Sequence, residues 1–194
     1  MRTVHVDVDS QIDFLFPAGA LYVPGAEKLL PAIAALNRHA ARTGSTVIST
    51  TDAHAEDDPE FADWPPHCVV GTVGQQKPAA TLLERRVVVP SVRGAVFLLD
   101  APEQIIVEKQ TIDLFRGTNL SFVLDHLQAQ RYVVYGVVTE ICVRSAAFGL
   151  LERGKLVELV TDAVGSLDPK KAEAMYAEFT AAGGRLTTSA AVLQ

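Results

Sequence analysis

The sequence predicts a three-layer α/β/α sandwich around a mostly parallel, Rossmann-like sheet, and two observations carry this prediction. Short apolar runs, of the kind that buried parallel strands need, recur at residues 4–8, 46–50, 105–107, 132–138, 156–160 and 185–188. Stretches with helical spacing of apolar residues lie among them, at residues 26–42, 119–130, 140–153 and 169–182. Alternating strands and helices form right-handed crossovers, so ligands are expected beyond the carboxyl ends of the strands.

Composition favours one compact globular domain over residues 1–194. The 194 residues are 48% hydrophobic and carry a net charge of -6 without a basic cluster, which argues against nucleic acid or an anionic membrane as partner. Small molecules are the expected ligands. The N-terminus does not resemble a signal peptide, and the two cysteines, Cys68 and Cys142, lie in unrelated contexts. We therefore expect reduced thiols and a cytoplasmic protein.

A carboxylate follows the first predicted strand. Asp9 comes directly after residues 4–8, at the end of the strand where a catalytic base could lie, and Asp7 is its rival two residues earlier. An ordinary turn is the other interpretation, because Asp and Ser commonly open loops.

The segment after the second strand carries potential metal ligands. Asp52 and His54 project to the same side of an extended backbone and can bind one ion together, and His67 follows in the long loop 53–78. Carboxylate and imidazole suit Zn, Fe or Mn. The alternative is a solvated acidic loop with two surface histidines. Three acidic residues compete as the third ligand: Glu60, Asp57 and Asp58.

Two further strand ends carry a cation and a thiol. Lys109 follows residues 105–107, where it could hold a carboxylate and a thiol in their ionised forms or simply face solvent. Cys142 lies where residues 132–138 turn directly into a helix. With Thr139 as the N-cap, the cysteine would occupy the first turn, where the helix dipole favours thiolate and free N–H groups could bind an oxyanion. A buried structural thiol is the alternative.

Taken together, these segments resemble the isochorismatase-like cysteine hydrolases, and within them the nicotinamidases and pyrazinamidases most closely. The resemblance covers nearly the whole chain. It rests on D-x-Q-x-D-F at residues 9–14, D-x-H at 52–54, W-P-P-H-C-x-x-G-T at 64–72, the lysine at 109 and G-V-x-T-x-x-C-V at 136–143. It implies the isochorismatase-like hydrolase fold, with Asp9 selected over Asp7 as catalytic aspartate beside Lys109 and the nucleophile Cys142.

The resemblance also implies further site residues. The N–H groups of Val138 and Cys142 would form an oxyanion hole, and the peptide bond before Val138 is typically cis in this family. One divalent metal, most often zinc, would be held by Asp52, His54, Glu60 and His67. Many relatives have a third histidine in this loop; Glu60 is assigned because some nicotinamidases place a glutamate there. Aromatic pocket walls are expected from Phe14, Trp64 and Phe115.

The implied activity is hydrolysis of nicotinamide to nicotinate and ammonia, and of pyrazinamide, through a cysteine thioester. A related amidohydrolase acting on a ureido, carbamoyl or biuret-like substrate is the first alternative, and a non-catalytic small-molecule binder is the second. Homo-oligomers are common in this family, so one is expected here. No role is assigned to three histidines, His5, His39 and His126, and Cys68 is not expected to be a ligand.

Overall fold

A computed structural model describes residues 1–92 and 94–194. In that part of the chain, parallel strands form one seven-stranded sheet in the order β3-β4-β2-β1-β5-β6-β7. The strands are β1 Thr3–Val8, β2 Thr46–Asp52, β3 Arg86–Val89, β4 Gln104–Lys109, β5 Arg131–Val137, β6 Leu156–Gly165 and β7 Arg185–Thr187. The predicted fold class is confirmed, with every pairing parallel.

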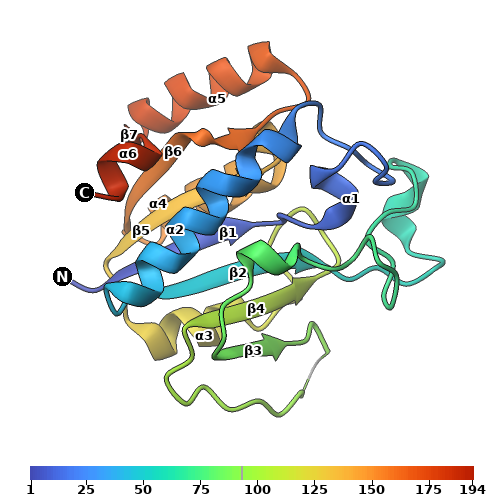
Figure 1. Ribbon diagram of the computed structural model, residues 1–194, viewed down its shortest axis with the longest axis horizontal. Helices are drawn as coiled ribbons and strands as arrows, with labels where there is room; N and C mark the ends of the chain where they lie inside the picture. The colour runs from blue at the N-terminus through green and yellow to red at the C-terminus, as the bar shows by residue number, and fades with distance from the viewer. Residues whose placement is uncertain (93) are drawn as a thin grey trace.

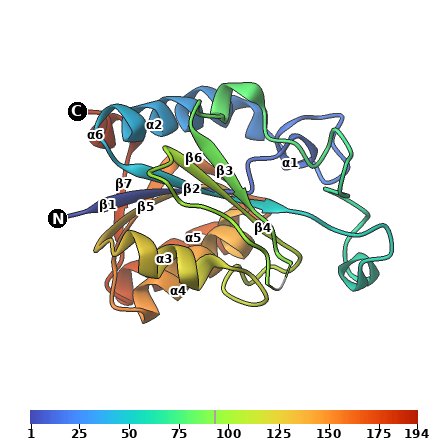
Figure 2. The same cartoon turned by 90° about the horizontal axis from the view of Figure 1, so that it is seen from below.

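Helices cover both faces of this sheet (Figure 2). One layer holds α1, α2 and α6, and the opposite layer holds α3, α4 and α5. Their bounds are α1 Ile12–Leu15, α2 Leu30–Arg42, α3 Leu120–Leu127, α4 Arg144–Glu152, α5 Pro169–Ala181 and α6 Ser189–Val192. Short 3-10 helices lie in the connections: η1 Ala26–Leu29, η2 Pro59–Ala62 and η3 Ala79–Thr81.

The core has a separate apolar cluster on each face of the sheet. On the α2 side, Ile33 and Leu36 pack against Val133 and Val160 of the central strands. The larger cluster, on the α3, α4 and α5 side, includes Leu120, Leu150 and Phe179 together with valines of β1 and β5, and the named residues of both clusters are buried. Strands covered on both faces need apolar residues at successive positions, which explains the short continuous runs in the sequence.

Element bounds differ from the predicted ones in ways that matter for the site. β2 and β4 continue to Asp52 and Lys109, because these two residues pair with each other in the ladder. The predicted helix 26–42 divides into η1 and α2, with Pro31 in the first turn of α2. β3 was not predicted, although its Val-rich sequence and the following Pro90 are typical of an edge strand.

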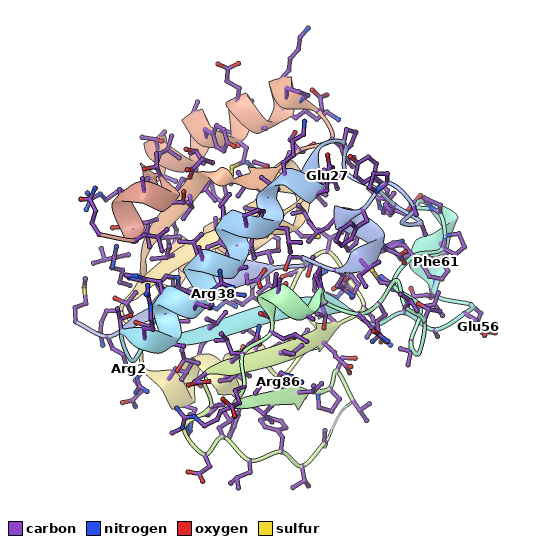
Figure 3. All side chains as sticks on the ribbon, viewed as in Figure 1. Arg2, Glu27, Arg38, Glu56, Phe61 and Arg86 are labelled. Carbon is purple, nitrogen blue, oxygen red and sulfur yellow. The ribbon has the colours of Figure 1, made fainter. Side chains whose placement is uncertain are left out.

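The carboxyl ends of the central strands point to one edge of the sheet, where α1 and the segment 53–78 lie (Figure 1). Glu56 lies at the outer tip of that segment and points away from the molecule (Figure 3). No helix in the described residues is both long enough and apolar enough to cross a membrane.

Candidate active site and metal centre

Three neighbouring strands, β4, β2 and β1, bring charged side chains to the carboxyl ends of the sheet. Asp52 ends β2 and Lys109 ends β4, and the two are register partners. Asp9 follows β1, with its backbone in the left-handed region at φ 46°. This turn is held from β2, because the Asp9 N–H donates to Thr50 O at 3.1 Å and the Thr50 hydroxyl donates to Asp9 Oδ1 at 2.5 Å.

Cys142 follows the neighbouring strand, β5. β5 ends at Val137, and the Val137–Val138 peptide bond is cis, as the family resemblance implied. The prediction that Thr139 caps the helix is wrong: Val138 is the N-cap, and the Thr139 hydroxyl donates to Gly165 O at 2.9 Å. Residues Thr139–Val143 form a π-helical turn before α4, so Cys142 is the fourth residue of that turn.

Lys109 is the centre of the cluster. Its Nζ lies 2.9 Å from Asp9 Oδ2 and 3.8 Å from Cys142 Sγ, and it also donates to Asp52 Oδ1. The Lys109 and Asp9 side chains are each only 1% exposed. The sequence-predicted residues Asp9, Lys109 and Cys142 thus meet in space, whereas the rival Asp7 pairs with Lys77 instead, at 2.9 Å.

Burial and the neighbouring carboxylates both shift the pKa values in this cluster. Burial raises the pKa of the Cys142 thiol well above its usual value; Lys109 opposes this shift and Asp9 and Asp52 reinforce it. For Lys109, burial acts to lower the pKa, but Asp52, Asp9 and Cys142 together raise it well above normal. Burial therefore acts against the thiolate that the position of Cys142 at the start of the helix was expected to favour.

Asp52, His54 and His67 form a potential metal centre. One ligand atom from each lies within 4.8 Å of the others, and all three residues are buried. His54 Nε2 is 3.9 Å from Asp52 Oδ1, and His67 Nε2 is 3.8 Å from Asp52 Oδ2. His67 Nδ1 hydrogen-bonds Pro65 O at 2.8 Å, which leaves its Nε2 available. Among the described residues, the buried His54 Nε2 has no hydrogen-bond partner, so the donor set fits a divalent ion.

The three acidic candidates for a further ligand lie in different places. Glu60 lines the same pocket as Asp52, outside the three-residue cluster, and desolvation followed by the charge of Asp52 raises its pKa. Asp58 contacts His54 Nδ1 at 3.0 Å, and Asp57 is exposed. Of the three, Glu60 alone faces the pocket.

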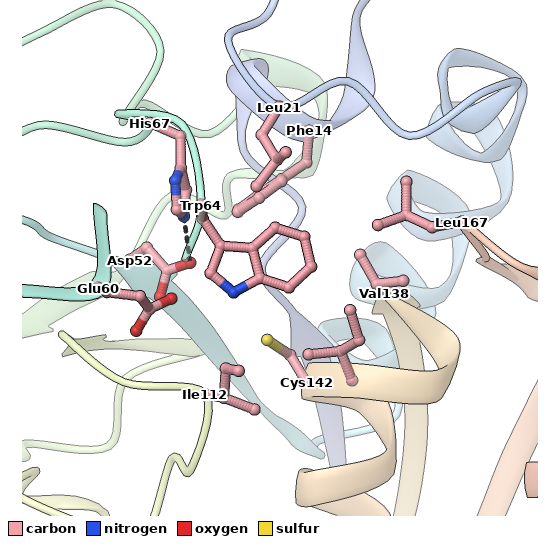
Figure 4. Close-up of a pocket in the computed structure, with 11 residues that line it drawn as sticks. Phe14, Leu21, Asp52, Glu60, Trp64, His67, Ile112, Val138, Cys142 and Leu167 are labelled. Atoms are coloured by element: carbon pink, nitrogen blue, oxygen red, sulfur yellow. Dashed lines mark ion pairs between the residues drawn. The ribbon is translucent and has the colours of Figure 1, made fainter. Parts of the chain in front are cut away.

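A small pocket joins the thiol to the metal centre (Figure 4). Its empty volume is about 310 Å³, counting the space that is open to solvent. Cys142, Asp52, Glu60 and His67 supply its polar groups. Apolar side chains make up the rest of the lining: Phe14, Leu21, Trp64, Ile112, Val138, Ile141 and Leu167.

Two of the three expected aromatic wall residues line this pocket, and the third does not. Phe14 and Trp64 are present. Phe115 instead lines a neighbouring surface cleft, where the Arg153 guanidinium stacks 3.8 Å from its ring centre and Gly149 leaves room for its edge. Phe115 is therefore not a wall of the pocket. Its ring packs against Gly149 of α4 and against Arg153, the residue that follows α4.

Comparison with known proteins identifies the family of this chain. A family model described as the isochorismatase domain matches residues 3–191. The chain belongs to the isochorismatase family. Within the family, a nicotinamidase of Saccharomyces cerevisiae is 26% identical over 192 residues, covering 84% of this chain and 87% of the yeast protein. The expected enzyme class, a hydrolase of carboxamide C–N bonds, is confirmed.

Solved structures share the fold over nearly the whole chain. A zinc complex of Pyrococcus horikoshii pyrazinamidase superposes with a TM-score of 0.80 at 28% identity, over 97% of this chain and 99% of that one. An N-carbamoylsarcosine amidase of Thermoplasma acidophilum gives 0.78 at 26% identity, over 97% of both chains.

Sequence reasoning left several supporting residues of this isochorismatase-family site without a role. Gln11 clamps the end of β2: its Oε1 accepts the Asp52 N–H at 2.7 Å, and its Nε2 donates to Asp52 O at 2.9 Å. Asp13 Oδ2 accepts the Cys68 N–H at 2.7 Å beside His67. Both belong to the D-x-Q-x-D-F match, so the signal was present. Phe61, whose ring centre lies 5.2 Å from that of His54, had no such signal.

Proposed function

We propose that this enzyme is a metal-dependent nicotinamidase that converts nicotinamide to nicotinate and ammonia, and also accepts pyrazinamide. One observation carries the proposal: the Cys142 sulfur and the Asp52–His67 side of the metal centre open into the same small pocket with aromatic walls. A flat heteroaromatic amide could lie between Phe14 and Trp64, with its amide carbon at the sulfur. The yeast nicotinamidase and the zinc-bound pyrazinamidase support this choice of substrate.

The proposed chemistry is nucleophilic catalysis by Cys142. Asp9 takes the thiol proton as the sulfur attacks the amide carbon, and the Lys109 ammonium balances the developing negative charge. Asp9 then gives the proton to the departing amine, so ammonia leaves and a thioester remains. A water molecule, deprotonated by Asp9, hydrolyses the thioester and releases the acid with a free thiol. A thiol whose pKa is raised by burial needs such a base beside it, and Cys142 is such a thiol.

The oxyanion of the tetrahedral intermediate is assigned to the backbone. In this proposal the N–H groups of Val138 and Cys142, at the N-cap and within the π-helical turn, donate to it. Both residues line the pocket, which supports the assignment.

In this proposal Asp52, His54 and His67 hold a divalent ion, zinc first and Fe or Mn next, and Glu60 contributes directly or through water. The ion would supply a Lewis acid that binds a heteroatom of the substrate. The chain's own residues position the substrate: Phe14 and Trp64 would hold its ring beside Cys142.

The first alternative is an amidohydrolase of ureido or carbamoyl acids, and the N-carbamoylsarcosine amidase structure favours it. Such substrates carry a carboxylate that needs a cationic partner. Among the described residues, the pocket lining contains the carboxylates of Asp52 and Glu60 but no arginine or lysine. The lining therefore favours an uncharged amide. A non-catalytic binder is disfavoured by the assembly of Asp9, Lys109 and Cys142.

The test is ammonia release from nicotinamide, pyrazinamide, biuret and an N-carbamoyl amino acid, each with zinc and with a chelator. We expect turnover of the two aromatic amides that depends on metal, and no turnover by Cys142→Ala with unchanged zinc content. His54→Ala should lose zinc and substrate affinity together. Turnover of the carbamoyl acid in preference to nicotinamide would assign the alternative function. The cytoplasmic location, single domain and homo-oligomer stay predictions.

A further inference from the structure

A carboxylate stands behind one of the metal-binding histidines. Asp58 Oδ2 lies 3.0 Å from His54 Nδ1, with the His54 side chain fully buried and the Asp58 side chain 8% exposed. This contact directs the other ring nitrogen, Nε2, towards Asp52. The distance is that of a hydrogen bond, but the direction of the ring nitrogen lies outside the angle that a hydrogen bond requires, so the contact is a close approach of the carboxylate to the imidazole.

His67 also directs Nε2 towards Asp52, but a backbone carbonyl, not a side chain, contacts its Nδ1. Its Nδ1 hydrogen-bonds the backbone carbonyl of Pro65 at 2.8 Å, and its Nε2 faces Asp52. A carbonyl oxygen can only accept, so Nδ1 of His67 carries the proton and Nε2 keeps the lone pair that a metal ion binds. At His54 a side chain replaces that carbonyl, so a single substitution can change the partner.

Asp58 is held in place by a second contact. Its Oδ1 accepts the Glu60 N–H at 3.0 Å and caps the 3-10 helix η2. With Oδ1 engaged, Oδ2 is the oxygen that faces the imidazole. An ionised carboxylate has no proton to donate, so it fixes the proton on Nδ1 of His54.

We propose that Asp58 is a positioning residue that selects the metal-binding tautomer of His54. The ion it serves is a divalent metal of the zinc type, bound through His54 Nε2. The inference rests on the metal part of the proposed function and is independent of which carboxamide is hydrolysed.

Three variants separate this role from loop structure and from charge. In Asp58→Asn, the side-chain oxygen still caps the Glu60 N–H, but the amide nitrogen now donates to His54 Nδ1 and moves the ring proton to Nε2. Asp58→Ser keeps one oxygen to cap the Glu60 N–H but loses the second side-chain atom, which in Asp58 faces the ring. Asp57→Asn removes the same charge from an exposed neighbour and is the matched control.

Zinc affinity, measured by competition with a chelator, should fall by about 10–100-fold in Asp58→Asn, the usual loss for a changed partner of a metal-binding histidine. Asp58→Ser should lose less than Asp58→Asn, and Asp57→Asn should bind zinc like the wild type. Asp58→Asn binding zinc within about threefold of wild type, or Asp58→Ser losing as much as Asp58→Asn, overturns the proposal.

The tautomer can be observed directly by nitrogen–proton NMR correlations of the histidine rings in the metal-free protein, at about pH 8, above the range where histidines ordinarily protonate. We expect the His54 proton on Nδ1 in wild type and on Nε2 in Asp58→Asn. The same tautomer in both proteins contradicts the proposal. Failure of the nicotinamidase assignment would instead appear as absent ammonia release, with the zinc affinities and tautomers still in the predicted order.

Discussion

Replacing Lys109 with methionine removes the ammonium ion that contacts both members of a buried pair of carboxylates. The ammonium contacts both Asp9 and Asp52, whose side chains are 1% and 4% exposed. Loss of one partner from a buried ion pair costs about 3–5 kcal/mol of unfolding free energy, because the remaining charge has neither water nor a counter-ion. Burial already raises the pKa of Asp52, and removal of Lys109 raises it further. One carboxyl group should therefore take up a proton on folding.

This proton uptake gives the prediction a pH signature. A carboxyl whose folded pKa lies above its unfolded pKa stabilises the fold at low pH and loses that contribution as the pH rises through the folded pKa. The stability deficit of Lys109→Met should thus be smaller at about pH 5 than at about pH 8. Urea unfolding of the metal-free protein measures it, with the exposed Lys170→Met as control. Turnover should fall by at least about a hundredfold. A variant as stable and active as wild type refutes the reasoning.

Three other substitutions or treatments have defined outcomes. Lys77→Met should lower the unfolding free energy in urea by about 3–5 kcal/mol, because it leaves the buried Asp7 carboxylate without its ammonium partner. The Asp7→Asn/Lys77→Met double variant should recover much of this loss. Equal stability of Lys77→Met and wild type would argue against the ion pair. Gly136→Ala should lose both stability and turnover, since φ is 118° there and a Cβ would collide with the backbone of Val8; a normal melting temperature speaks against this. Because burial raises the pKa of Cys142, iodoacetamide should modify this thiol slowly at neutral pH and faster only above about pH 8.5, as measured by the mass of the Cys142 peptide. Rapid alkylation at neutral pH would contradict this expectation.

The sheet and the convergence of the site were predictable because each depends on a local pattern. Apolar runs locate the strands, and the parallel topology carries their carboxyl ends to one edge. Asp9, Lys109 and Cys142 each follow or end such a run, so their meeting follows from the order of the strands. The edge strand β3 was missed even though its valines were visible.

Features that depend on burial and on side-chain direction were not predictable. The raised pKa of the Cys142 thiol comes from desolvation by the assembled core, which no local motif encodes. The ring of Phe115 is directed to Arg153 by packing on α4, although its position in the sequence places it near the pocket. The role of Asp58 depends on a turn of the loop that brings it back to His54.

The central claim is that Cys142 forms a covalent thioester with the substrate. Acid quenching of the zinc-loaded enzyme during nicotinamide turnover, followed by mass analysis of the peptides, tests it most directly. We predict a nicotinoyl adduct on the Cys142 peptide in wild type and in Cys68→Ala, and none in Cys142→Ala, which should also release no ammonia. Ammonia release by Cys142→Ala at the wild-type rate, with no adduct on the wild-type Cys142 peptide, would contradict the mechanism.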